Sequence, residues 1–188
     1  ELHQIHGKKK DVFGAPKLSK KEQRGKDDHF LVKHFAGDVI YFDALGNNGT
    51  ELWAYNTSNN TGWMVSDINN GSHSNPGEHL SVLVGDTIYF SADDGSTGVE
   101  LWAHNTSNHS TWQVADIESG SGSSFYGENL CILVGNTFYF GAHDGISGHE
   151  LRAHDTSNSS TWQVADINSG TGGSGPGIEM GILVGDTI

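Results

Sequence analysis

Short runs of alternating apolar and polar residues recur along the whole chain and predict β-strands rather than helices. The run TIYFSAD, residues 87–93, carries apolar side chains at every second position, as expected of a strand with one buried face. The run HLSVLVG, residues 79–85, is apolar on both faces and therefore predicts an innermost strand. No segment has a convincing helical period, so we expect an all-β protein.

Turn signals join these runs into units of four strands. Gly85-Asp86 separates the first two runs, and DDGSTG, residues 93–98, supplies an Asp-Gly hairpin signal before the third strand, residues 99–104. A polar stretch leads to a fourth strand, residues 112–117, and a Gly- and Ser-rich linker follows. Four antiparallel strands and a longer crossover predict a blade of a β-propeller.

The unit repeats with a period of about 50 residues, which is a propeller-like length. Glu-Leu recurs at residues 51, 100 and 150, and Trp at residues 63, 112 and 162. Complete units begin at about residues 29, 79 and 129. Residues 177–188 repeat only the first two strands, so residues 1–28 could supply the other half of a fourth blade. We expect four blades, with an open fragment of a larger propeller as the alternative.

The repeated phrases also resemble a known family. The pattern DG-x-x-G-x-ELW, a polar turn, W-x-V-x-DI and L-x-x-x-G-x-x-x-YF-x-A resembles the ELWxxDGT-type repeats of large secreted microbial proteins, over residues 29–188. The resemblance implies a propeller-like surface module, in a family that mostly lacks an assigned activity. This chain departs from the family after ELW, where Asn or Asp followed by Thr-Ser replaces Asp-Gly-Thr.

Charge divides the chain into a basic segment, residues 1–28, and acidic propeller repeats, residues 29–188. Nine of the ten Lys and Arg lie in residues 1–33 beside five acids, about +4, whereas the remainder holds one Arg and eighteen acids, about −17. The acidic body argues against nucleic-acid binding. The basic segment suggests an arm that binds the acidic body of another copy, joining subunits head to tail into filaments.

Seven Asn-X-Ser/Thr sequons predict N-glycosylation and hence an extracellular or cell-surface location. No hydrophobic run approaches the length of a membrane span. In a propeller, the turns between third and fourth strands share one face, so we expect that face to carry most of the sugar. The candidate acceptors are Asn48, Asn56, Asn59, Asn70, Asn105, Asn108 and Asn158.

The hairpin acids and the histidines are the candidate metal ligands. Asp94 and Asp144 align in Asp-Gly turns and are the first candidates for calcium, the one cofactor we consider possible. A zinc site would lack a third ligand, so the eleven histidines are interpreted as surface or rim residues. Cys131, the only cysteine, excludes an internal disulfide and is expected at a tight, buried position.

No catalytic motif is evident, and the repeated tryptophans favour packing between blades over stacking on sugars. The sequence therefore predicts a non-catalytic extracellular structural or adhesive propeller, a glycoprotein that associates with itself. Extracellular glycans or surface proteins are possible partners. Two alternatives stay open: a glycan-binding, lectin-like propeller, and a polysaccharide-acting enzyme whose carboxylates converge from different blades.

Overall fold

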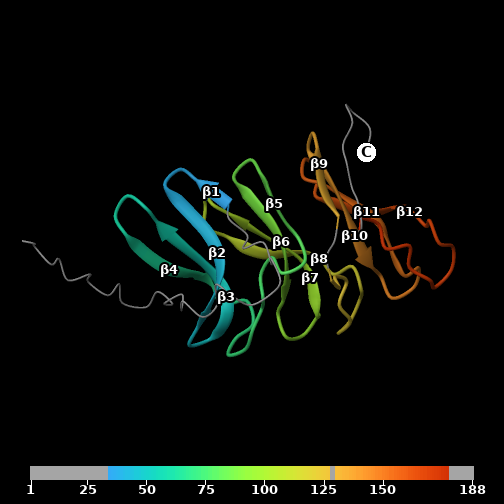
Figure 1. Cartoon of the computed structure of the whole chain (residues 1–188), viewed down its shortest axis with the longest axis horizontal. Coiled ribbons are helices and arrows are strands. Elements are labelled where there is room, and N and C mark those ends of the chain that lie inside the picture. The colour runs from blue at the N-terminus through green and yellow to red at the C-terminus, as the bar shows by residue number, and fades with distance from the viewer. Residues whose placement is uncertain (1–33, 128–129, 178–188) are drawn as a thin grey trace, which may run out of the picture.

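The computed structural model describes residues 34–127 and 130–177, which form three four-stranded antiparallel sheets (Figure 1). In every sheet, neighbouring strands are also consecutive in the sequence. The first sheet holds β1 (His34–Ala36), β2 (Val39–Gly46), β3 (Gly49–Asn56) and β4 (Thr61–Ser66). The second holds β5 (Ser81–Val84), β6 (Thr87–Asp93), β7 (Val99–Asn105) and β8 (Thr111–Ala115). The third holds β9 (Cys131–Val134), β10 (Thr137–His143), β11 (His149–Asp155) and β12 (Ser160–Ala165).

Glycine sets the turn between the first two strands of each sheet. Gly37, Gly85 and Gly135 have φ angles of 60°, 57° and 61°. This left-handed conformation is costly for residues with a Cβ atom, and it suits the tight twist of a two-residue hairpin. The Gly-Asp and Gly-Asn pairs predicted as turns therefore act as turns in all three sheets.

A β-bulge recurs in the pairing of the last two strands of each sheet. In the second sheet Leu101 pairs with Ala115 and Trp102 with Gln113, which leaves Val114 as the extra residue of β8. The register shifts at the equivalent position in the other two sheets. Bulges bend a strand and end regular pairing, and the Asp-Ile pair predicted as the end of the fourth strand lies just beyond it.

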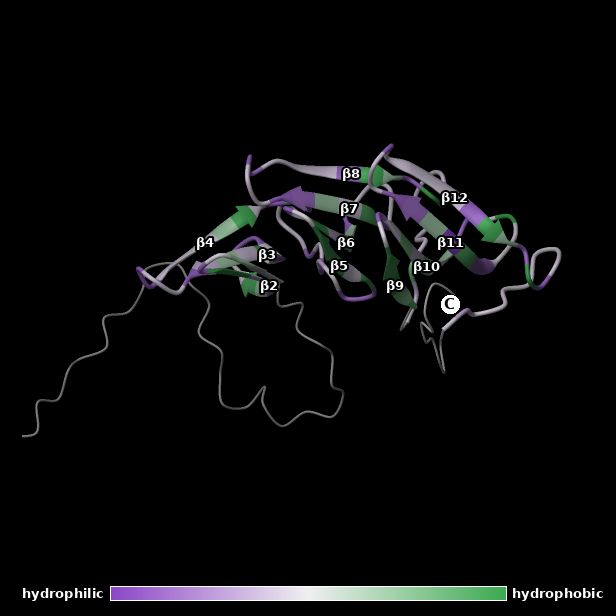
Figure 2. Ribbon diagram, turned by 90° about the horizontal axis from the view of Figure 1, so that it is seen from above, coloured by the Kyte–Doolittle hydropathy of each residue, from purple (hydrophilic) through white to green (hydrophobic). Residues whose placement is uncertain are grey.

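Apolar faces of neighbouring sheets pack against one another. Tyr41 and Ala54 of the first sheet share a buried cluster with Ile88 and Phe90 of the second. The opposite face of the second sheet contributes Tyr89 to a cluster that the third sheet completes. Figure 2 shows β8 and β12 on the outer, convex side, with β5 and β9 beneath them, and β5 also contacts β9. The first strand of a unit is thus the innermost, as predicted.

The prediction of an all-β fold built from four-stranded antiparallel sheets is confirmed. The predicted fourth blade, from residues 1–28 and 177–188, lies outside the described residues apart from Gly177. Within the described ranges, no helix is long and apolar enough to span a membrane.

The interpretation of all histidines as surface or rim residues is wrong for two of them. His104 and His154 are only 0% and 1% exposed. Their rings pack against tyrosines of the preceding sheet, Tyr41 at 5.5 Å and Tyr89 at 5.3 Å between ring centroids. Each Nδ1 atom bonds a threonine hydroxyl of the next strand, at 2.9 Å for His104 and 2.8 Å for His154. These histidines are contacts between sheets because their flat rings bury well beside tyrosine.

Candidate functional site

In each sheet, a buried glutamate of the third strand accepts hydrogen bonds from the linker that follows the sheet. Glu100 accepts hydrogen bonds from Ile117 N at 2.7 Å, from Ser124 N at 3.1 Å and from Ser124 Oγ at 2.6 and 2.7 Å. The first and third sheets repeat this arrangement with Glu51 and Ser74, and with Glu150 and Ser174. We call each such set a glutamate–serine cluster. It satisfies a backbone N–H group just beyond the fourth strand and polar groups of the linker that follows.

The three glutamates are all 0% exposed, but their pKa values do not shift in the same direction. Burial raises the pKa of Glu100 to about 7, outweighing the bonds from Ser124 and Ile117, and it also raises the pKa of Glu51. Burial acts upward on Glu150 too, but the bonds from Ser174 and Ile167 outweigh it and lower the pKa.

The turns between third and fourth strands lie beside the turns between first and second strands, as the propeller geometry predicts. In each sheet, a threonine N–H of the third-to-fourth turn donates a hydrogen bond to a carbonyl of the first-to-second turn. The donors are Thr57, Thr106 and Thr156, at 2.8, 2.8 and 2.9 Å. Five of the seven sequons occupy these third-to-fourth turns. Their acceptors therefore share one face of the molecule: Asn56, Asn59, Asn105, Asn108 and Asn158.

These five asparagines are not equally accessible. Asn59, Asn108 and Asn158 are exposed, and each accepts a bond from the hydroxyl two residues on, at 2.6 Å. Asn56 and Asn105 are half-buried, each at the end of a strand. The Nδ2–H group of Asn105 donates a hydrogen bond to Thr87 Oγ1 at 3.2 Å.

The two remaining sequons lie elsewhere. Asn48 is half-buried, and its Nδ2–H group donates a hydrogen bond to Asp67 Oδ2 at 2.6 Å. Asn70 is exposed in a linker. The modification itself stays a prediction at all seven asparagines.

The calcium candidates lie in the predicted Asp-Gly hairpins, where both carboxylates cap the turn. Asp94 Oδ1 accepts from Ser96 N and Thr97 N at 2.8 Å each. Asp144 Oδ1 does the same for its own turn, and its Oδ2 atom pairs with Arg152 Nη2 at 2.5 Å. No group of three or more His, Cys, Asp or Glu that could hold a metal ion occurs in residues 34–127 and 130–177. Calcium binding at these two acids stays a prediction.

The tryptophans divide into two groups. Trp53 is buried at 8% exposure, and Trp102 packs against the cluster between the first two sheets, so both serve the expected packing. Those of the outer strands are 37%, 39% and 40% exposed: Trp63, Trp112 and Trp162. Cys131 is half-buried, and burial raises the pKa of its thiol to about 12.

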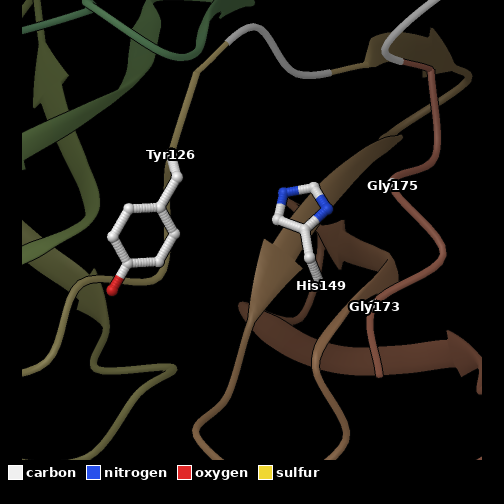
Figure 3. Close-up of a pocket in the computed structure, with 4 residues that line it drawn as sticks. All are labelled: Tyr126, His149, Gly173 and Gly175. Carbon is white, nitrogen blue, oxygen red and sulfur yellow. The ribbon is translucent and has the colours of Figure 1, made fainter. Parts of the chain in front are cut away.

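An open hollow of about 320 Å³ lies between the linker that leaves the second sheet and the third sheet. Tyr126, His149, Gly173 and Gly175 line it, and the side chains of Tyr126 and His149 stand on opposite sides of the gap (Figure 3). The Tyr126 side chain is 56% exposed. Burial and then the neighbouring His143 lower the pKa of His149, which favours the neutral imidazole.

A carboxylate and a second imidazole lie beside this hollow. Glu118 Oε2 is 2.8 Å from His143 Nδ1, and the His143 ring meets the Tyr126 ring edge-on, with 6.2 Å between centroids. Sequence reasoning named Tyr126 in no role, because one aromatic residue in a Gly- and Ser-rich linker carries no periodic signal.

Comparison with known proteins yields partial structural likenesses and no family. No protein-family model matches the sequence, and no curated protein matches it either. Among solved structures, TolB from Acinetobacter baumannii is 14% identical with a TM-score of 0.47, covering 68% of this chain and 29% of that one. Puromycin hydrolase is 10% identical with a TM-score of 0.45, covering 70% and 19%. This chain therefore spans less than a third of either protein.

Proposed function

We propose that this protein is a non-catalytic extracellular structural or adhesive module of the β-propeller class. The observation that carries this proposal is the repeated use of the buried glutamates. Glu51, Glu100 and Glu150 all accept backbone and serine bonds within their own unit, and each therefore supports the fold. Because all three are buried and engaged in these bonds, none of them is available as one of the paired carboxylates that a glycoside-cleaving enzyme uses.

The resemblance to ELWxxDGT-type repeats agrees with this proposal, because those repeats belong to secreted surface proteins. The exposed acceptors Asn59, Asn108 and Asn158 also agree with it, since a glycosylated face requires a secreted protein. Self-association completes the proposal: the basic segment, residues 1–28, binds the acidic body of a neighbouring copy. Such head-to-tail contacts build open filaments unless the rotation closes a ring.

Sedimentation and negative-stain microscopy of the whole chain at low and high salt test the self-association. We expect filaments or oligomers at low salt that dissociate as salt screens the charges. Replacing Lys8, Lys9 and Lys10 with Glu should abolish assembly, whereas replacing them with Arg should preserve it, because Arg keeps the charge. A monomer at every salt concentration would contradict self-association.

A panel of polysaccharides incubated with the protein tests the non-catalytic part. We expect no release of reducing ends above the level of a heat-denatured control. Release that disappears on substitution of one non-repeating acid, such as Glu118→Gln, would favour the polysaccharide-acting enzyme instead.

A further inference from the structure

Each boundary between neighbouring sheets joins two different apolar faces. The preceding sheet presents a tyrosine face, which holds a Tyr, a Leu, a Val and an Ile from its last three strands and the residues just beyond them. The members are Tyr41, Leu52, Val65 and Ile68 in the first sheet, and Tyr89, Leu101, Val114 and Ile117 in the second. The following sheet presents a phenylalanine face on its second strand: Ile88, Phe90 and Ala92 in the second sheet, and Phe138, Phe140 and Ala142 in the third. The same pair of faces therefore packs together at both boundaries.

The third sheet repeats the tyrosine face, but no sheet of the described ranges covers it. Val164 and Ile167 are 41% and 60% exposed, whereas their counterparts in the first two sheets pack against the buried clusters. Tyr139 and Leu151 are half-buried, whereas the counterparts of both are at most 7% exposed. An apolar face that is buried in two units and open in the third is a candidate interaction surface.

The first sheet carries an open phenylalanine face at the other end of the row of sheets (Figure 1). Ile40 and Phe42 alternate with Tyr41 along β2 and therefore point away from the second sheet, against which Tyr41 packs. Both are half-buried, whereas their counterparts are at most 1% exposed: Ile88 and Phe90 in the second sheet, and Phe138 and Phe140 in the third. The two open faces are thus the two halves of the boundary that the chain builds twice internally.

A contact between aromatic rings marks the register of each internal boundary. A tyrosine ring of one sheet lies 5.5 or 5.3 Å from a histidine ring of the next, in the pairs Tyr41–His104 and Tyr89–His154. Tyr139 occupies the tyrosine position of the third sheet, and Tyr55 of the first sheet occupies the position of the two histidines. Docking the open faces in the same register would bring Tyr139 against Tyr55 of another copy, and aromatic pairs at such distances are favourable.

We propose that the tyrosine face of the third sheet docks on the phenylalanine face of the first sheet of a second copy, with Tyr139 against Tyr55 of that copy. The same contact forms at the other end, so two copies close a ring. Two copies supply six of the described sheets, within the range of about four to eight blades in propellers, whereas three copies supply nine. This inference rests on the self-association in the proposed function, but it places the contact on apolar sheet faces instead of the basic segment.

Sedimentation equilibrium of the full chain at low salt and at about 1 M salt tests the docking, because the Debye length at 1 M is only about 3 Å. A two-copy assembly should persist at high salt, since apolar contacts do not depend on charge. Replacing Lys8, Lys9 and Lys10 with Glu should leave this pair intact. A pair that resists both salt and the replacement supports the docking and contradicts assembly through the basic segment. Assembly that both treatments abolish supports the basic segment and overturns the docking.

Two isoleucines of the third sheet provide a matched pair of variants. Ile167→Asp places a charge on the tyrosine face at a position that is already 60% exposed, so the single chain should still fold. It should raise the dissociation constant of the pair by about tenfold or more, because the ring contains this contact twice. Ile146→Asp should stay within about threefold of the parent. Ile146 is 77% exposed in a hairpin, and its counterpart Ser96 is exposed even though both faces of the second sheet are covered.

A cross-link between copies checks the register. One copy carries Tyr139→Cys and the other Tyr55→Cys, both with Cys131→Ser, which installs the residue of the second sheet. A short bismaleimide should join the two, because facing sheets lie about 10 Å apart. Leu45→Cys, 60% exposed and off the phenylalanine face, should not replace Tyr55→Cys.

Three results would overturn the proposal. The first is a monomer at high salt, which would favour coverage of the tyrosine face by residues 178–188 of the same chain. The second is equal weakening of the pair by Ile146→Asp and Ile167→Asp. The third is a cross-link that forms equally well with Leu45→Cys.

Discussion

The glutamate–serine cluster of the second sheet gives the sharpest prediction about stability. Glu100→Gln keeps the shape of the side chain and one acceptor oxygen but removes the ionisation. Burial raises the pKa of Glu100 to about 7, from 4.5 in an exposed carboxyl. A raised pKa means that the folded state binds the proton more tightly than the unfolded state.

The sign and size of the effect follow from this linkage. The stability that Glu100 contributes is complete below pH 4.5 and declines as the pH rises through about 7. At 1.36 kcal/mol per pKa unit, the decline amounts to about 3 kcal/mol. Glutamine mimics the protonated acid at every pH. The unfolding free energy of the parent minus that of Glu100→Gln should therefore fall by about 3 kcal/mol between about pH 5 and about pH 8.

Urea unfolding followed by circular dichroism at several pH values measures this difference. Glu150→Gln is the matched control, because hydrogen bonds lower the pKa of Glu150 below its usual range. A lowered pKa confines the pH dependence to more acidic conditions, and the control difference should stay flat over the same window. A flat difference for Glu100→Gln, or one that rises with pH, would refute the reasoning.

Three other predictions concern the remaining described features. Burial and then His109 lower the pKa of His104 to about 4, so its contribution to stability disappears as the pH falls from about 6.5 to about 4; His104→Phe should flatten the acid side of the unfolding profile. Gly98→Ala should cost more than about 1 kcal/mol, because φ is +74° and a Cβ atom would collide with a backbone carbonyl, whereas Gly85→Ala, with nothing nearby, should lower the melting temperature less. In a glycosylating host, Asn108→Gln should remove a glycosidase-sensitive mass that Asn105→Gln leaves in place, because the amide of Asn105 is already bonded to Thr87.

The repeat made the strands and turns predictable, but it concealed how polar residues are used. The Glu-Leu pairs were found by their spacing, yet their role required the bulge that brings Ile117 N to Glu100. The serines partnering the glutamates recur with the same period, which is the signal that could have identified them. Ser124 was overlooked because serine is common in flexible linkers.

The sequence by itself determined the periodic features of this protein: strand order, the glycine turns, the blade-like unit and the division of charge. Local sterics and alternation fix these, and repetition multiplies the signal. Only the tertiary structure decided which polar groups are buried and which aromatic rings are exposed. His104 lies between sheets although it borders a polar turn, and Tyr126 lines a hollow although it lies in a Gly- and Ser-rich linker. Burial depends on neighbours contributed by another sheet, and a residue's own repeat does not encode those neighbours.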